Sequence, residues 1–195
     1  IPTGNSRCIV NATFPATTAP LPTSNQLLAA LSEANYRKLE PHLEPVPLPL
    51  GKNIYEAGDR ITHVFFPTEG VVSLLNTLED GASAEIAVTG NEGLVGISLF
   101  LGGAETIAPP RYAVVQNAGH AYRLRGDFLM KEFERGGELH HLLLRYTQAL
   151  ITQIAQTAMC NRHHTVAEHL CRWLLLSMDR LPGNTLHMTQ ELIAY

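Results

Sequence analysis

The chain has 195 residues, of which 45% are hydrophobic and 16% are charged, and its formal net charge at pH 7 is -4. This composition is typical of a folded globular protein and excludes wholesale disorder. It also provides no strongly basic surface, so any DNA binding must reside mainly outside this stretch of sequence.

Cysteine usage and hydropathy indicate the compartment. Cys8, Cys160 and Cys171 are too few and too scattered for a disulfide framework, which favours a reducing cytoplasm. The apolar runs are too short to span a bilayer, and residues 1–23 lack the continuous apolar segment of a signal peptide. We therefore expect a cytoplasmic protein without a membrane partner.

The first periodic segment is helical. Ser24 or Asn25 starts a stretch in which apolar residues recur at helical spacing, and Pro41 bends or ends it. We expect short helices between residues 24 and 43.

From Val46 onward, apolar residues alternate with polar or small ones, which indicates β-strands. Turn signals such as Thr68-Glu69-Gly70 and Gly90-Asn91-Glu92-Gly93 separate the short runs. Many short strands with regular turns favour a sandwich, a barrel or a jelly roll. The prolines between Val46 and Gly51 suit an edge strand, and the further expected strands cover residues 53–55, 62–66, 71–77, 83–88, 111–116 and 119–124, in a roll of roughly eight strands.

The longest periodic segment runs from Glu138 to about Met159 and predicts a long helix. Its apolar residues lie on more than one side, so the helix must be buried on more than one side. It could lie only across its own β-domain, but packing against a second copy of the chain fits the pattern better. The predicted homodimer interface consists of Leu139, Leu143, Tyr146, Leu150 and Ile154.

Two further helical signals follow. A helix from about Thr165 to Arg180 ends at Leu181-Pro182-Gly183-Asn184, which is a strong stop signal. Thr189 then suits an N-cap, and Glu191 suits the first turn of another helix. Such a helix is too short to be stable alone, so we expect it to continue beyond the given residues.

Taken in order, these elements and the closing run Thr189–Ala194 resemble the Crp/Fnr family of bacterial transcription regulators. The resemblance implies an α+β fold: a double-stranded β-helix (jelly roll) with short N-terminal helices, followed by a long dimerisation helix and a second helix. DNA would bind through residues beyond Tyr195, so no DNA-contacting residue is assigned. The implied parts are an N-terminal arm (1–23), a cyclic-nucleotide-binding-like sensor roll (24–135), dimerisation and linker helices (136–183), and the truncated start of a winged helix-turn-helix domain (184–195).

The resemblance also implies an effector pocket. In nucleotide-binding members of that family, a Glu accepts a hydrogen bond from the ribose hydroxyl, and an Arg neutralises the cyclic phosphate. Here Ile97 stands where the Glu would be, while Arg111 matches the Arg. The purine-facing positions become Ile154 and Ala155, which carry no polar side chain. We therefore expect no response to cyclic AMP, and a different small-molecule effector stays open. The pocket candidates are Gly96, Ile97, Ser98, Arg111, Tyr112 and Ala113.

Other kinds of site find little support. Cys160, His164, His169 and Cys171 form a cluster of metal-like ligands, but no second pair completes it, so we predict no metal and no other cofactor. No P-loop, dinucleotide fingerprint or Ser/His/Asp signature occurs, and His120 alone does not form the His-x-His of a cupin. We therefore predict that the protein is not an enzyme.

Two alternatives from other classes remain. One is a β-roll enzyme, against which stands the absence of a catalytic cluster. The other is a cyclic-nucleotide-binding module of a channel or kinase, against which stands the helix start at Thr189–Tyr195.

Overall fold

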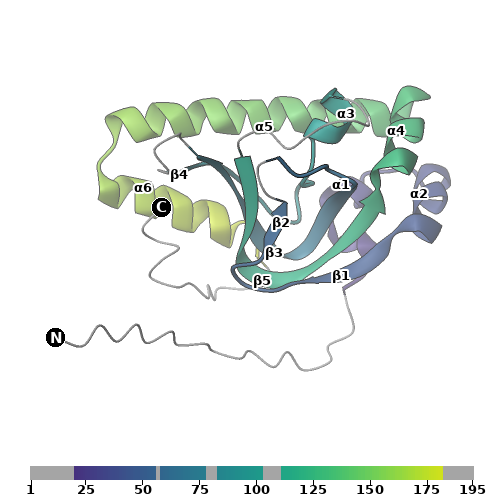
Figure 1. Cartoon of the computed structure of the whole chain (residues 1–195), viewed down its shortest axis with the longest axis horizontal. Coiled ribbons are helices and arrows are strands. Elements are labelled where there is room, and N and C mark those ends of the chain that lie inside the picture. The colour runs from purple at the N-terminus through teal and green to yellow at the C-terminus, as the bar shows by residue number, and fades with distance from the viewer. Residues whose placement is uncertain (1–19, 56–57, 78–82, 103–110, 182–195) are drawn as a thin grey trace.

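The computed structural model describes residues 20–55, 58–77, 83–102 and 111–181. Within them, a five-stranded antiparallel sheet is combined with helices at both ends of the chain, which confirms the α+β roll. Figure 1 shows the sheet curling below the long helix α5, with α6 folding back beneath the end of α5. Most of the predicted N-terminal arm and the predicted helix start at 189–195 lie outside the described residues.

The N-terminal helices are short and are fixed by one buried side chain. They are η1 (Pro22–Ser24), α1 (Gln26–Ala29), α2 (Glu33–Leu39) and η2 (Glu40–His42). Asn25 caps α1: its Oδ1 accepts from the backbone N–H groups of Leu27 and Leu28. Its Nδ2 donates to the carbonyl oxygens of Pro67 and Gly93, each at 2.8 Å, which ties α1 to the roll.

The sheet contains fewer and longer strands than the sequence predicts. They are β1 (Glu44–Leu48), β2 (Asn53–Tyr55), β3 (His63–Thr77), β4 (Ser83–Thr89) and β5 (Arg111–Arg125), in the order β1-β5-β3-β4, with β2 also paired to β5. The predicted strands 62–66 and 71–77 merge into β3, and 111–116 and 119–124 merge into β5.

The predicted turn at Thr68-Glu69-Gly70 is therefore wrong. Gly70 has a φ of 91°, and the β3–β5 pairing shifts register around it, so the segment forms bulges in a continuous ladder. A Cβ at Gly70 would lie 2.6 Å from the carbonyl oxygen of Asn117. Glycine is thus required here because the two long strands approach closely where they bend.

The strands present two faces, since successive side chains point to opposite sides of a sheet. On one face, Val72 and Leu74 of β3 meet Ala113 and Val115 of β5 in the main hydrophobic core. We call this the inner face. The outer face carries buried residues that lie apart from that core: Ser73, Leu75, Val88, Val114 and Gln116.

Four helices complete the described fold. The short α3 (Ser98–Gly102) follows β4, and α4 (Gly126–Glu134) follows β5 directly. The long α5 (Glu138–His163) extends four residues beyond the predicted end, and α6 (Val166–Met178) begins after a Thr165 cap. Thr165 and Glu168 form a capping box, which explains the sharp restart of the helix.

The inner face of α5, which carries the residues predicted to form the dimer interface, packs on its own roll. Leu139, Leu143, Tyr146 and Leu150 are all less than 10% exposed and belong to the core of the single chain, with Ile154 partly buried against it. These side chains therefore have little surface left for a partner. Any dimer contact of α5 must use another face.

Tyr146 shows how closely α5 approaches the roll. Its hydroxyl donates to the carbonyl oxygen of Leu94 at 3.1 Å and lies 3.2 Å from the Thr89 hydroxyl. A Cβ at Gly93 would lie 2.4 Å from the Tyr146 ring, so only glycine leaves room for it. Burial raises the pKa of the Tyr146 phenol, which therefore stays protonated as a donor.

Candidate functional site

The first predicted pocket segment lies where β4 leads into α3. Val95 exchanges two backbone hydrogen bonds with Phe65, at 2.8 and 3.0 Å. Gly96 then turns the chain with a φ of 106°, a conformation that side chains other than glycine rarely adopt. Ser98 begins α3 immediately afterwards.

Ile97, which the resemblance places at the ribose-binding position of the family, lies against apolar side chains. It is partly buried and packs against the main core, while Leu99 and Phe100 behind it are buried. The position thus offers no acceptor to a ribose hydroxyl.

The second predicted segment, at the start of β5, splits between the two faces of the sheet. Ala113 is fully buried in the inner core, and so it shares that core with Ile97. Tyr112 lies on the other face, where its hydroxyl donates to the Ser83 hydroxyl at 2.9 Å. The backbone of Arg111 pairs with Asn76, and its side chain lies outside the described part of the chain.

A polar cluster on the outer face was missed by sequence reasoning. The β3–β4 ladder pairs Leu74 with Ala87 and Leu75 with Glu85, so Ile86 is an extra residue in a bulge. The bulge places Glu85 on the same face as Ser73. A single Glu within the apolar run Ser83–Val88 was the one signal that could have drawn attention to it.

Three donors converge on one oxygen of Glu85. Its Oε2 accepts from the Ser73 hydroxyl at 2.6 Å, from Trp173 Nε1 at 3.2 Å and from Gln116 Nε2 at 3.3 Å. Burial raises the pKa of the Glu85 carboxyl, and these donors and the charge of Arg172 oppose that effect only in part. The other amide atom of Gln116, Oε1, is buried without a hydrogen-bond partner among the described residues.

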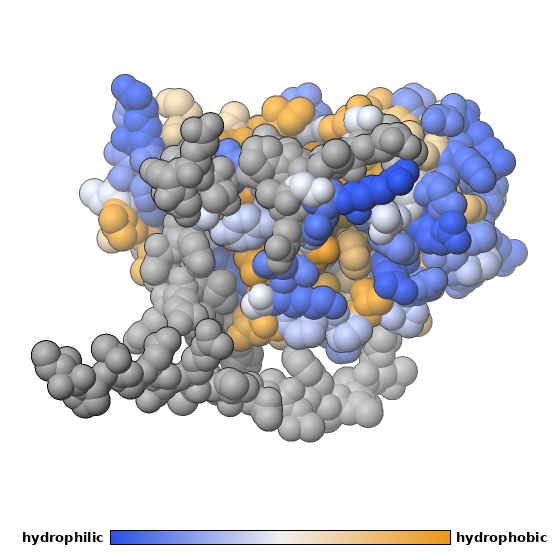
Figure 2. All heavy atoms as spheres, in the orientation of Figure 1, coloured by the Kyte–Doolittle hydropathy of each residue, from blue (hydrophilic) through white to orange (hydrophobic). Residues whose placement is uncertain are grey.

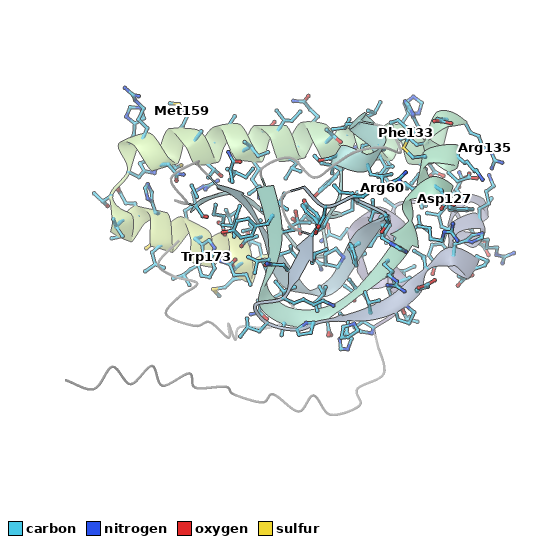
Figure 3. The ribbon with its side chains drawn as sticks, in the orientation of Figure 1. Arg60, Asp127, Phe133, Arg135, Met159 and Trp173 are labelled. Carbon is cyan, nitrogen blue, oxygen red and sulfur yellow. The ribbon has the colours of Figure 1, made fainter. Side chains whose placement is uncertain are left out.

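A cavity of about 370 Å³ lies at the opposite end of the roll, where Figure 3 places Arg60 and Asp127. Arg125 binds Asp127 through two hydrogen bonds of 2.6 and 3.0 Å, which lower the pKa of that carboxyl. His63 contacts the Thr62 hydroxyl at 2.9 Å, and burial lowers the pKa of its ring. The cavity therefore combines paired charges with a neutral histidine. Its lining is Arg60, Ile61, Thr62, His63, Leu99, Arg125, Gly126 and Asp127.

The comparison with known families decides what the roll is. Residues 45–135 match the family model described as "Cyclic nucleotide-binding domain". This segment is therefore similar to cyclic nucleotide-binding domains. None of the curated protein sequences matches the chain.

Solved structures extend this likeness beyond residues 45–135. FixK2 from Bradyrhizobium japonicum is 15% identical, with a TM-score of 0.63 over 78% of this chain and 75% of its own. The c-di-GMP responsive global regulator CLP of Xanthomonas campestris is 13% identical, with a TM-score of 0.61 over 80% and 76%. The catabolite activator protein of Thermus thermophilus is 20% identical, with a TM-score of 0.51 over 69% and 60%. The Crp/Fnr resemblance is thereby confirmed at the level of the fold.

The residues of the predicted metal-like cluster lie at the end of α5 and in the first half of α6. His169 Nε2 lies 2.8 Å from the backbone oxygen of Cys160, which is buried, whereas Cys171 is exposed. Within the described ranges, no group of three His, Cys, Asp or Glu side chains could hold a metal ion. No helix in the same ranges has both the length and the hydropathy needed to cross a bilayer.

Proposed function

We propose that the chain is the sensor and dimerisation part of a Crp/Fnr-like transcription regulator, a non-catalytic protein of the cytoplasm. The observation that carries this proposal is the extent of the likeness to FixK2 and CLP. It covers 78% and 80% of the chain, more than residues 45–135 can supply, so it includes helices outside the matched domain.

The proposed division follows that architecture. Residues 24–135 form the sensor roll, and residues 136–183 form the dimerisation and linker helices. Residues 184–195 begin a winged helix-turn-helix domain that binds DNA, and residues 1–23 form an arm. The net charge of -4 supports placing the DNA contacts outside this chain.

The proposed homodimer uses the exposed side of α5. Leu144, Ile151 and Met159 are 41%, 52% and 57% exposed, and spacings of seven and eight residues place them along one side of the helix. Such a stripe is typical of a helix that packs against a second helix. Figure 2 shows hydrophobic atoms along the edge that α5 forms, and Figure 3 shows Met159 pointing away from the roll.

The proposed effector pocket uses Gly96–Ser98 and Arg111–Ala113, with Ile97 and Ala113 on the inner side of the roll and Tyr112 on the outer face, and it does not take cyclic AMP. Ile97 supports this proposal because it packs against the core and has no group to accept from a ribose hydroxyl. A small molecule with an apolar part in place of the ribose would suit that position. Its identity is open.

The test compares residues 1–195 with a chain that continues beyond Tyr195 in a gel shift on duplex DNA. The longer chain should bind a palindromic site whose half-sites are about one helical turn apart, as a two-fold dimer requires. Residues 1–195 should bind no specific site. Equal binding by both chains, or no specific binding by the longer one, would show that the assignment is wrong.

A further inference from the structure

The way α6 is held on the roll differs from the way α5 is held. All of α6 is described, and Ser177 is its one fully buried residue. Val166 and Leu175 are 83% and 63% exposed, so much of the apolar surface of the helix faces solvent. A helix of 13 residues is marginal on its own, and α6 therefore depends on specific contacts to stay in place.

The first such contact joins the middle of α6 to the outer face of the sheet. Trp173 donates its indole N–H to Glu85 Oε2 at 3.2 Å, beside the donors from Ser73 and Gln116. Arg172 is the charged α6 residue whose field reaches this carboxylate, and it donates to the Thr157 hydroxyl of α5 at 3.1 Å. Figure 3 labels Trp173 on α6.

The second contact joins Arg180, two residues beyond the end of α6, to the turn after β4. Arg180 Nε donates to Glu92 Oε1 at 2.6 Å, and the two side chains are only 12% and 29% exposed. Glu92 is held ready for it, because its Oε2 accepts from the backbone N–H of Gly90 at 3.0 Å. A Cβ at Gly90 would lie 2.6 Å from the Cβ of Arg180, so the end of α6 rests directly on this glycine.

Arg180 also reaches α5. In the orientation that satisfies both its neighbours, the Gln153 amide accepts from Arg180 Nη2 at 2.8 Å and donates to the carbonyl of Val88 at 3.2 Å. One guanidinium thus links α6, α5 and the sheet. A partly buried ion pair with fixed hydrogen bonds contributes much more than an exposed one.

We propose that Glu85 with Trp173 and Glu92 with Arg180 form a two-point latch, and that breaking it releases α6 as a unit while the roll and α5 stay folded. The inference goes beyond the proposed function, since it needs neither an effector nor DNA. In a regulator of the proposed kind, the latch sets the position of whatever follows Leu181. With the latch closed, α6 is docked on the roll. With the latch broken, α6 is released while the rest of the fold is unchanged.

The molecule carries its own reporter, because Trp173 is the single tryptophan of the chain. Acrylamide quenching of its fluorescence and hydrogen exchange of the α6 amides should be measured on residues 1–195 for Glu92→Gln, Arg180→Met and Glu85→Gln. The matched control is Glu44→Gln, which removes a Glu–Arg pair with Arg123 at the β1–β5 edge and leaves α6 untouched.

Glu92→Gln and Arg180→Met should each speed exchange in α6 by about tenfold and raise quenching of Trp173, while β3 and β5 exchange as before. The double variant should be no looser than Arg180→Met, because that change already removes the ion pair together with the contact to Gln153. Glu85→Gln should raise the quenching of Trp173 fluorescence above that of Glu92→Gln and Arg180→Met.

Two results would overturn the latch. In one, α6 of the Glu92→Gln protein exchanges as slowly as in Glu44→Gln. In the other, β3 and β5 loosen by the same factor as α6, which would mean that the contacts merely stabilise the whole fold. Gly90→Ala gives a second approach that changes no charge, since its Cβ must displace Arg180. It should loosen α6 in the same selective way.

Discussion

Leu150 and Ile151 are consecutive residues of α5 that face different surroundings: Leu150 is 4% exposed and packs in the core, whereas Ile151 is 52% exposed. The same helix thus serves its own roll with one side and leaves an apolar stripe on another. Substitutions at these two positions therefore test folding and dimer formation independently.

We expect Leu150→Glu to destabilise folding and Ile151→Glu to abolish the proposed dimer. An unpaired charge at Leu150 would enter the core, at a cost of about 3–5 kcal/mol, while a charge at Ile151 stays in solvent in the monomer. Sedimentation velocity at micromolar concentration and thermal unfolding of both variants check this. A wild-type chain that sediments as a monomer would contradict the proposed dimer.

The contact between Tyr146 and the β4–α3 turn should be costly to disturb. Tyr146→Phe leaves the buried Leu94 carbonyl without its donor, at about 1–3 kcal/mol in the free energy of unfolding. Gly93→Ala should cost at least as much, because its Cβ would overlap the Tyr146 ring. Urea unfolding measures both losses, and Val166→Ala, at an 83% exposed side chain, serves as the control with little expected change.

Glu85 should make the free energy of unfolding depend on pH in a distinct way. Burial raises its pKa in the folded chain above the ordinary value of 4.5, so the folded state holds this proton more tightly than the unfolded state does. Its contribution is therefore fully present below pH 4.5 and is lost as the pH rises through the folded-state pKa.

The comparison of wild type with Glu85→Gln isolates this effect. Other carboxyls, such as those of Glu138 and Glu168, have lowered pKa values that act in the opposite direction, but they are common to both proteins. Urea unfolding between pH 4.5 and 7.5 should show wild type losing stability relative to Glu85→Gln as the pH rises. A difference that stays constant with pH would contradict the prediction.

Cyclic nucleotides should bind weakly if at all. In the proposed pocket, Ile97 takes the ribose position, so the ribose hydroxyl would lose its partner at a cost of about 1–3 kcal/mol. Titration calorimetry with cyclic AMP and cyclic GMP should show no binding tighter than millimolar. A micromolar dissociation constant that Arg111→Ala removes would restore the nucleotide-sensor interpretation.

The sequence predicted those structural elements that are determined by residues close to them in the chain. The Asn25 cap, the long α5 and the stop after α6 follow from side chains that act within one or two turns of their own helix. The order of these elements was enough to indicate the roll and its family. Long-range contacts decided the rest.

The errors have a common physical origin in contacts between distant segments. Gly70 resembled a turn because the approach of β5 that requires glycine there cannot be seen from its neighbours in the sequence. The bulge at Ile86 moved Glu85 to the outer face, where α6 covers it. Helical spacing marked the apolar sides of α5 but could not tell a chain's own core from that of a partner.

The four-residue turn from Gly90 to Gly93 contacts three helices at once. Gln26 of α1 donates its backbone N–H to the Asn91 carbonyl at 2.7 Å, Tyr146 of α5 lies over Gly93, and Arg180 at the end of α6 lies over Gly90. Surface turns are usually the sites where an epitope tag or a fluorescent domain can be inserted without harm. This one is not such a site, because an insertion would displace α1, α5 and α6 together.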